Sequence, residues 1–198
     1  MTKKNMTKYI VTVDENGTRW WYNENNLRHR TDGPAIEYAD GSKFWYLHDK
    51  CHRVDGPAVE RADGTKHWYL NNQLHRTDGP AVEWSNGSKS WYLNGKCHRT
   101  DGPAVERADG TKEWYLNGEC HRVDGPAIEY ANGTKHWYLN DQLHRTDGPA
   151  VEYADGDKYW FLNGVQLTEI EFLNKTKKAS CEGKEIEIDG VKYKLVKA

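Results

Sequence analysis

The sequence predicts an all-β protein, an elongated array of about seven stacked antiparallel β-hairpins that is capped at both ends. The first observation is a unit of 23 residues whose Asp-Gly-Pro-Ala core recurs without insertion. The second is a pair of short β-prone runs in each unit, joined by an Asp-Gly or Asn-Gly turn. A fixed period of this size is typical of arrays in which each unit buries its apolar side against its neighbours. The core begins at Asp32, Asp55, Asp78, Asp101, Asp124 and Asp147.

The composition supports a folded chain with a thin aromatic core. Only 36% of the residues are hydrophobic, and the mean hydropathy is -1.00. Disordered chains are poor in aromatics, whereas this chain has nine Trp and twelve Tyr. These large rings can form a core without many aliphatic side chains.

Charge and hydropathy limit the classes of partner. A net charge of -2 provides no overall field for nucleic acid, so a nucleic-acid partner is not favoured. No apolar run approaches the ~20 residues that span a bilayer, and the basic start is not followed by the apolar region of a secretory signal. We therefore expect a cytoplasmic protein. Membrane contact is left open but is not favoured.

The chain divides into three parts in order. Residues 1–16 hold a cap strand at Tyr9–Val13, and residues 17–167 form the hairpin array. Residues 168–198 are expected to be a linker, basic around Asn174–Lys178, followed by a C-terminal β-hairpin that packs on the last repeat as a cap.

Each unit is expected to contain two strands, Pro34–Tyr38 and Lys43–Leu47 in the first full copy. Glu37 and Lys43 have counterparts in every unit, and opposite charges across a strand pair are favourable. This pairing favours a three-residue loop with glycine in the left-handed position. The strand alternation then separates Ala35, Trp45 and Leu47 on one face from Ile36, Tyr38, Phe44 and Tyr46 on the other.

Three cysteines, Cys51, Cys97 and Cys120, share one repeat position that is Leu at 74 and 143. A position that alternates between Leu and Cys is an apolar packing position. Equivalent positions in neighbouring hairpins are roughly 9.6 Å apart, which is too far for a disulfide. We expect reduced cysteines in the array and an exposed Cys181 outside it.

The unit resembles the MORN repeat, also 23 residues long. Asn94-Gly-Lys96, Tyr130 and Asp40-Gly-Ser42 match the MORN pattern in order and spacing, over about three quarters of the chain. The chain departs from it at Gly33-Pro34-Ala35 and in its constant His-Arg. This variant is similar to a divergent MORN-like group in uncharacterised bacterial, phage and large-virus proteins.

The resemblance implies a stack of β-hairpins used for protein binding, self-association and sometimes lipid contact. The phage-like variant further implies an inhibitor of a host protein, such as a defence protein. A weaker likeness, to the Trp-Tyr-x-Leu-Asn hairpins of choline- and glucan-binding cell-wall repeats, implies glycan contact.

The repeated polar residues are interpreted as structural. An active site is a single arrangement of unlike groups, whereas here the same His, Arg, Asp and Glu recur in every unit, so we predict no enzyme, no catalytic residue and no cofactor. The Cys-His dipeptides point to opposite faces of a strand and do not form a zinc site. The repeat histidines are His29, His52, His75, His98, His121 and His144.

Two strongly varying repeat positions are the predicted partner-binding residues. Tyr, Trp and Arg are enriched in binding hot spots, so the expected function is a scaffold that grips a host or bacterial protein along this stripe. Tolerant surface positions, a lipid- or glycan-contacting module and a homo-oligomer remain the alternatives. The first position is Tyr38, Arg61, Trp84, Arg107, Tyr130 and Tyr153, and the second is Phe44, His67, Ser90, Glu113, His136 and Tyr159.

Overall fold

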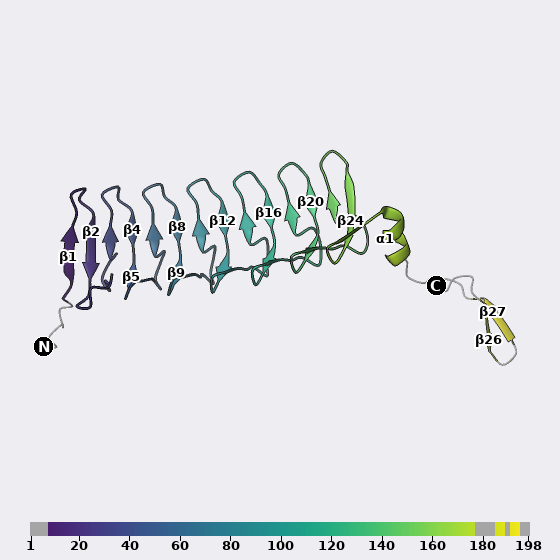
Figure 1. The fold of residues 1–198 in the computed structure, drawn as a ribbon, viewed down its shortest axis with the longest axis horizontal. Helices are drawn as coiled ribbons and strands as arrows, with labels where there is room; N and C mark the ends of the chain where they lie inside the picture. Colours follow the sequence, from purple (N-terminus) through teal and green to yellow (C-terminus); the bar gives the residue numbers. More distant parts are fainter. Residues whose placement is uncertain (1–7, 177–184, 189–190, 195–198) are drawn as a thin grey trace.

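The computed structural model describes residues 8–176, 185–188 and 191–194. Residues 10–167 form a row of upright hairpins that join into one continuous antiparallel sheet of fifteen strands, in the order β1-β2-β3-β4-β7-β8-β11-β12-β15-β16-β19-β20-β23-β24-β25 (Figure 1). The predicted all-β fold class, with about seven stacked hairpins, is therefore confirmed.

The first hairpin, β1 (Ile10–Val13) with β2 (Arg19–Tyr22), begins the sheet at the predicted cap strand. Each later unit adds one hairpin to it. The added strands are β3 (Ile36–Glu37), β4 (Lys43–Phe44), β7 (Val59–Glu60), β8 (Lys66–His67), β11 (Val82–Glu83), β12 (Lys89–Ser90), β15 (Val105–Glu106), β16 (Lys112–Glu113), β19 (Ile128–Glu129), β20 (Lys135–His136), β23 (Val151–Glu152) and β24 (Lys158–Leu162).

The loop of this hairpin has the predicted length. Glu37 lies opposite Lys43, and the Tyr38 N–H donates to the Ser42 carbonyl across three loop residues. Gly41 has a φ of 92°, a conformation that glycine adopts without strain. Lys43 also lies opposite Glu60 of the next unit, so acidic and basic side chains alternate across successive strands.

Each unit also contains a second hairpin, which the sequence analysis did not predict as separate strands. The expected single strand Lys43–Leu47 is interrupted at Trp45, whose N–H donates to the Ala58 carbonyl of the next unit. Tyr46 then pairs with Cys51 in its own unit. The partner strand changes at Trp45, and this change breaks the strand in two.

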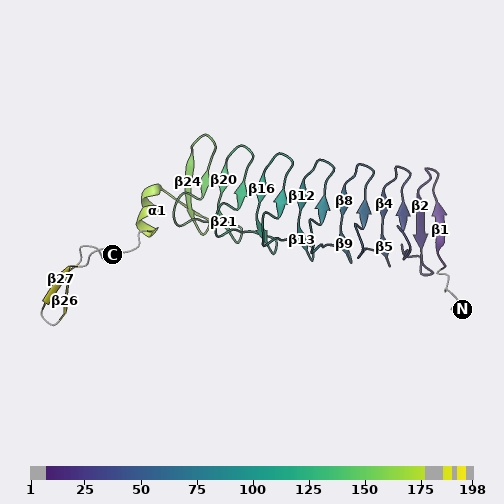
Figure 2. The same ribbon diagram turned by 180° about the vertical axis from the view of Figure 1, so that it is seen from behind.

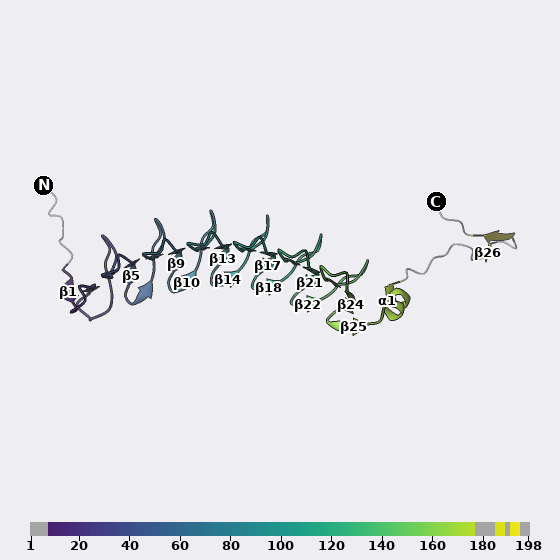
Figure 3. The same cartoon turned by 90° about the horizontal axis from the view of Figure 1, so that it is seen from above.

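Two-residue turns close these second hairpins, and both turn residues have positive φ, as at His48 (50°) and Asp49 (61°). In Figures 2 and 3 the second hairpins form a row of their own along one border of the array. Their strands are β5 (Tyr46–Leu47), β6 (Lys50–Cys51), β9 (Tyr69–Leu70), β10 (Gln73–Leu74), β13 (Tyr92–Leu93), β14 (Lys96–Cys97), β17 (Tyr115–Leu116), β18 (Glu119–Cys120), β21 (Tyr138–Leu139) and β22 (Gln142–Leu143).

The core is thin and runs between the two rows of hairpins. At one junction between units, Cys51, Ala58 and Val59 are buried against the partly buried rings of Tyr46 and Tyr69. The repeat alanines have no exposed surface, which leaves no room for a larger side chain. These fully buried alanines are Ala35, Ala58, Ala81, Ala104, Ala127 and Ala150.

The array ends differently from the prediction. Without a following unit, β24 runs unbroken and pairs with β25 (Val165–Leu167). Helix α1 (Glu169–Thr176) follows, contacts β24 and β25, and buries Phe172. This helix replaces the linker that the sequence predicts after residue 167. The predicted C-terminal hairpin forms as β26 (Glu185–Ile188) with β27 (Val191–Lys194), whereas Cys181 lies outside the described residues.

Candidate binding surface

The predicted stripe consists of an outer row and an inner row, which together we call the variable face. The outer row, Tyr38 and its counterparts, stands where the first hairpin enters its loop, because each of these residues donates its N–H across that loop. Five of the six outer side chains are exposed, and Tyr38 is half-buried. The exposed members include Trp84 at 38% and Tyr153 at 44% of their surface.

The inner row lies within the sheet and is less accessible than the sequence analysis assumed. Each residue of this row pairs with the Ile or Val of its own hairpin, as Phe44 does with Ile36. Ser90 and Glu113 are buried, whereas Phe44, His67 and His136 are half-buried. Only Tyr159, in the last unit, is exposed. The inner-row side chains therefore pack beneath the outer row and expose little surface for a partner.

Side-chain contacts join the two rows. Tyr38 meets Phe44 edge-on at 5.1 Å between ring centroids, and the Arg61 guanidinium lies 6.0 Å from the Phe44 ring. At the other end of the array, Tyr153 meets both His136 (5.9 Å) and Tyr159 (5.8 Å). Varying residues of neighbouring units are therefore in contact near both ends of the array.

One acidic group is held inside this surface. Arg107 Nη2 lies 2.6 Å from Glu113 Oε1, and the Tyr115 hydroxyl donates to Glu113 Oε2 at 3.1 Å. Burial and the nearby carboxylate raise the pKa of Tyr115. Glu113 is thus occupied by its neighbours, and Arg107, with 55% of its side chain exposed, is the accessible member of the group.

His136 is the one described residue with buried side-chain nitrogens that lack a hydrogen-bond partner. Its ring is enclosed by Tyr130, Tyr138 and Tyr153, at centroid distances of 5.1 to 6.2 Å. Burial lowers the pKa of His136, because the cation loses hydration and gains no acceptor. The residue is therefore neutral and packs as an aromatic ring at physiological pH.

The opposite face, which we call the clamp face, is nearly identical in every unit. Its centre is an Arg whose guanidinium lies 4.0 to 4.3 Å from the ring centroid of a Trp. In one unit Arg99 donates to Asp101 (2.8 Å), to the Pro103 carbonyl (3.2 Å) and to Glu106 (3.0 Å). The hydrogen bond from Arg99 also lowers the pKa of Asp101. The stacked pairs are Arg30–Trp21, Arg53–Trp45, Arg76–Trp68, Arg99–Trp91, Arg122–Trp114 and Arg145–Trp137.

The constant glycine of the Asp-Gly-Pro corner is explained by this clamp. A Cβ on Gly33 would lie 2.8 Å from Arg30 Cζ, and one on Gly79 would lie 2.9 Å from Arg76 Cζ. No real Cβ contact is this short, so the guanidinium occupies the space of the absent side chain.

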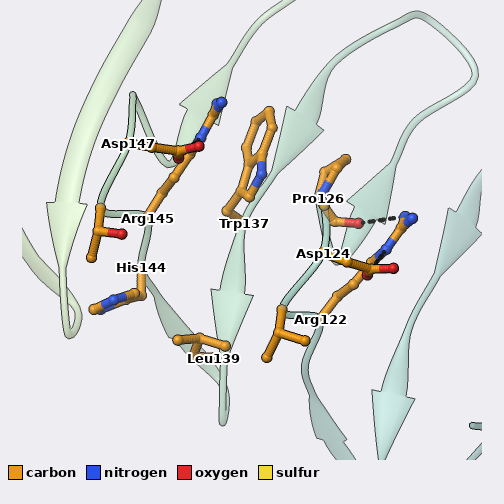
Figure 4. A pocket seen from close by; sticks show the side chains of 11 residues that line it. Arg122, Asp124, Pro126, Trp137, Leu139, His144, Arg145 and Asp147 are labelled. Atoms are coloured by element: carbon orange, nitrogen blue, oxygen red, sulfur yellow. Dashed lines mark hydrogen bonds and ion pairs between the residues drawn. The ribbon is translucent and has the colours of Figure 1, made fainter. Parts of the chain in front are cut away.

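Five equivalent pockets, of about 460 to 550 Å³, lie between neighbouring clamps. Figure 4 shows one of them, in which Trp137 stands between Arg145 and the corner that carries Asp124 and Pro126. The other lining residues that Figure 4 labels are Arg122, Leu139, His144 and Asp147. These pockets are not evident from the sequence of one unit, because each is lined by residues of two neighbouring units.

The repeat histidines connect successive units. Nδ1 of each one accepts a hydrogen bond from the first N–H of the next unit's two-residue turn, at 3.0 to 3.3 Å. Ser42 and Thr65 act similarly in the first hairpin, where each hydroxyl accepts the N–H of a residue twenty positions later. These contacts give the constant His and Ser/Thr positions a structural role.

The array cysteines are free, as predicted. Cys51 and Cys120 are buried and Cys97 is partly buried, and burial raises the pKa of each thiol to about 12. Among residues 8–176, 185–188 and 191–194, no group of three or more His, Cys, Asp or Glu side chains is placed to hold a metal ion.

No protein-family model matches the chain, and no curated protein matches it. The MORN resemblance therefore remains a prediction from the repeat pattern. In the described part of the chain, no helix has the length and apolar character needed to cross a membrane.

Proposed function

We propose that the protein is a non-enzymatic repeat scaffold that binds a partner protein along its variable face. The observation that carries this proposal is the outer row, in which exposed Tyr, Arg and Trp side chains change from unit to unit on a constant frame. The Arg–Trp clamps, the repeat histidines and the Ser/Thr hydroxyls already connect the array. The fold itself therefore does not require a particular residue in the outer row.

The chemistry of the outer row suits a protein partner. Exposed aromatic rings and guanidinium groups can bury large area with few rotatable bonds and also form hydrogen bonds. Arg61, Trp84 and Arg107 occur in successive units and are all exposed. Units are spaced by two strands, so these three side chains span roughly 19 Å, which is within the width of a standard protein interface.

The resemblance to phage-like repeats extends this proposal to inhibition of a host protein. Occupying a partner's own interaction site would require only tight binding along the variable face, without chemistry. This part of the proposal rests on the resemblance alone.

The test is capture of partners from host lysate by the wild-type chain and by a four-site variant, Tyr38→Ala/Arg61→Ala/Trp84→Ala/Arg107→Ala. The matched control is Val54→Asp/Val123→Asp, because these valines are 81% and 82% exposed on the clamp face. A partner that binds the wild type and the control, but not the folded four-site variant, supports the proposal. A partner that binds all three chains equally contradicts it.

A second candidate function is contact with a glycan chain on the clamp face. It is favoured by the five equivalent pockets, each with a Trp ring, a Leu side chain and polar groups at the rim, because a ligand with a regular repeat can contact several at once. Glycan binding that Val54→Asp/Val123→Asp abolishes and the four-site variant retains would favour this function. Binding to lipid vesicles would instead favour membrane contact.

A further inference from the structure

The two ends of the array are finished in different ways. At the C-terminal end, α1 packs against β24 and β25 and buries Phe172. At the N-terminal end, β1 pairs with β2 along one edge, and no strand of the described chain pairs with its other edge. An open, apolar strand edge is a template for pairing with another strand.

The pairing of β1 with β2 determines which backbone N–H and C=O groups of β1 point away from the sheet. The Asp14 N–H donates to the Thr18 carbonyl, so Asp14 belongs to a hydrogen-bonded pair with β2. Because such pairs alternate along an antiparallel ladder, Thr12 and Ile10 also direct their N–H and C=O groups towards β2. The groups of Tyr9, Val11 and Val13 consequently point away from the sheet.

The side chains of this edge are apolar and accessible. Ile10 is 50% exposed, Val11 is 49% exposed and Val13 is 60% exposed. Tyr9 is fixed at the start of the strand, because its hydroxyl contacts Thr31 Oγ1 at 2.8 Å and accepts the Thr31 N–H. The edge is therefore held in place before any partner binds.

We propose that this edge binds the same edge of a second copy of the chain, antiparallel and around a two-fold axis at Val11. In this register Val11 pairs with Val11, and Tyr9 pairs with Val13 on both sides, so all the outward N–H and C=O groups are used. Lys8 of each copy lies opposite Asp14 of the other, which places opposite charges at both ends of the pairing. This self-complementarity favours a second copy over an unrelated strand.

The dimer joins two fifteen-stranded sheets into one. A two-fold axis perpendicular to a sheet keeps equivalent faces on the same side, so the two variable faces form one extended surface. The interface uses only one short strand from each copy, so the dimer is in reversible exchange with the monomer.

A cysteine pair tests the register directly. In the proposed dimer the two Val11 Cα atoms are about 5.5 Å apart, within disulfide range, whereas the two Val13 Cα atoms are separated by about 13 Å along the strands. In a Cys181→Ser background, Val11→Cys should form a covalent dimer under mild oxidation at least tenfold faster than Val13→Cys. Equal rates for the two variants would overturn the register.

The association itself is tested by sedimentation equilibrium of the full chain over a range of concentrations. Val11→Pro removes an outward N–H that β2 does not use, so it should abolish the dimer without unfolding the array, as checked by circular dichroism. Lys8→Glu should raise the dissociation constant at least threefold, whereas Lys50→Glu, the same charge change within the array, should leave it unchanged. A wild type that is monomeric at every concentration, or a Val11→Pro variant that still dimerises, would overturn the proposal. Binding of a different protein's strand to this edge by a monomeric chain would also overturn it.

Discussion

The clamp face and the variable face are built on the same strands but obey different constraints. On the clamp face, each Arg is held by a Trp ring, an Asp, a Glu and a carbonyl group, and the set is repeated almost unchanged. On the variable face, Phe, His, Ser, Glu and Tyr occupy one inner-row position without altering the register. The comparison shows that contacts between units fix the residues of one face and leave the other free to change.

The largest expected difference is between an Arg of the clamp face and an aromatic of the variable face. Arg99→Ala removes the donor of three hydrogen bonds and the guanidinium that stacks on Trp91. It should therefore lower the free energy of unfolding by about 2 to 4 kcal/mol. Trp84→Ala should lower the free energy of unfolding by only about 0.5 kcal/mol, apart from the packing of its ring, because Trp84 is exposed. Urea denaturation of both variants measures this, and equal losses would contradict the distinction between the faces.

The next prediction concerns the space beside the guanidinium. Gly79→Ala should destabilise the protein by about 1 to 3 kcal/mol, because its Cβ would lie 2.9 Å from Arg76 Cζ and would displace the stack. The cost should be much smaller when Arg76→Ala is already present. Gly87→Ala is the control, since its cost comes from a positive φ of 89° and not from a contact. Additive effects of Gly79→Ala and Arg76→Ala would show that the clamp does not select this glycine.

His136 provides a pH test of the variable face. Because burial lowers its folded pKa, the unfolded chain binds the proton more readily, and stability should fall as the pH drops below about 6.5. His136→Phe, which copies Phe44 of the first full unit, should flatten this dependence and add about 1 kcal/mol at pH 7. Thermal unfolding at pH 7.5 and pH 5 tests both. A variant as sensitive to pH as the wild type would contradict this account. The remaining slope comes from His67 and His29, whose pKa values burial also lowers.

The smallest expected effect concerns the two-residue turns between units. Asn72 and Asp141 accept the N–H of a cysteine in the preceding unit, at 2.6 and 2.7 Å. Gly95 stands at the same turn position and cannot do so, and a Cβ there would make only ordinary contacts with Gln73. Gly95→Asn should therefore stabilise the protein by about 0.5 kcal/mol. Chemical denaturation measures this change, and a destabilised variant would show that the φ of 78° outweighs the new hydrogen bond.

The features that depend on one unit could be predicted from the sequence. The Glu37–Lys43 register and the three-residue loop followed from turn chemistry and charge, and the buried free cysteines followed from the Leu/Cys alternation. The break at Trp45 could not be predicted in this way, because its cause is the Ala58 carbonyl of the next unit. The burial of Glu113 likewise depends on Arg107 and Tyr115 together.

Helix α1 was missed although the sequence contained a signal for it. Thr168 and Glu171 form a capping box: the Thr168 hydroxyl accepts the Glu171 N–H, and the Glu171 carboxylate accepts the Thr168 N–H. The short, basic stretch after it favoured a linker in the sequence analysis. The pockets of the clamp face were missed for a different reason, since each is lined by residues of two units that are 23 positions apart.

The short span of the hydrogen bonds between units has a consequence for how the array can change in length. These side-chain contacts connect residues 19 to 25 positions apart, so no unit depends on a distant one. Removal or duplication of a block of 23 residues would leave the same contacts between each pair of neighbouring units. Recombination within the gene can therefore change the number of units, and with it the number of outer-row side chains, without a change of fold.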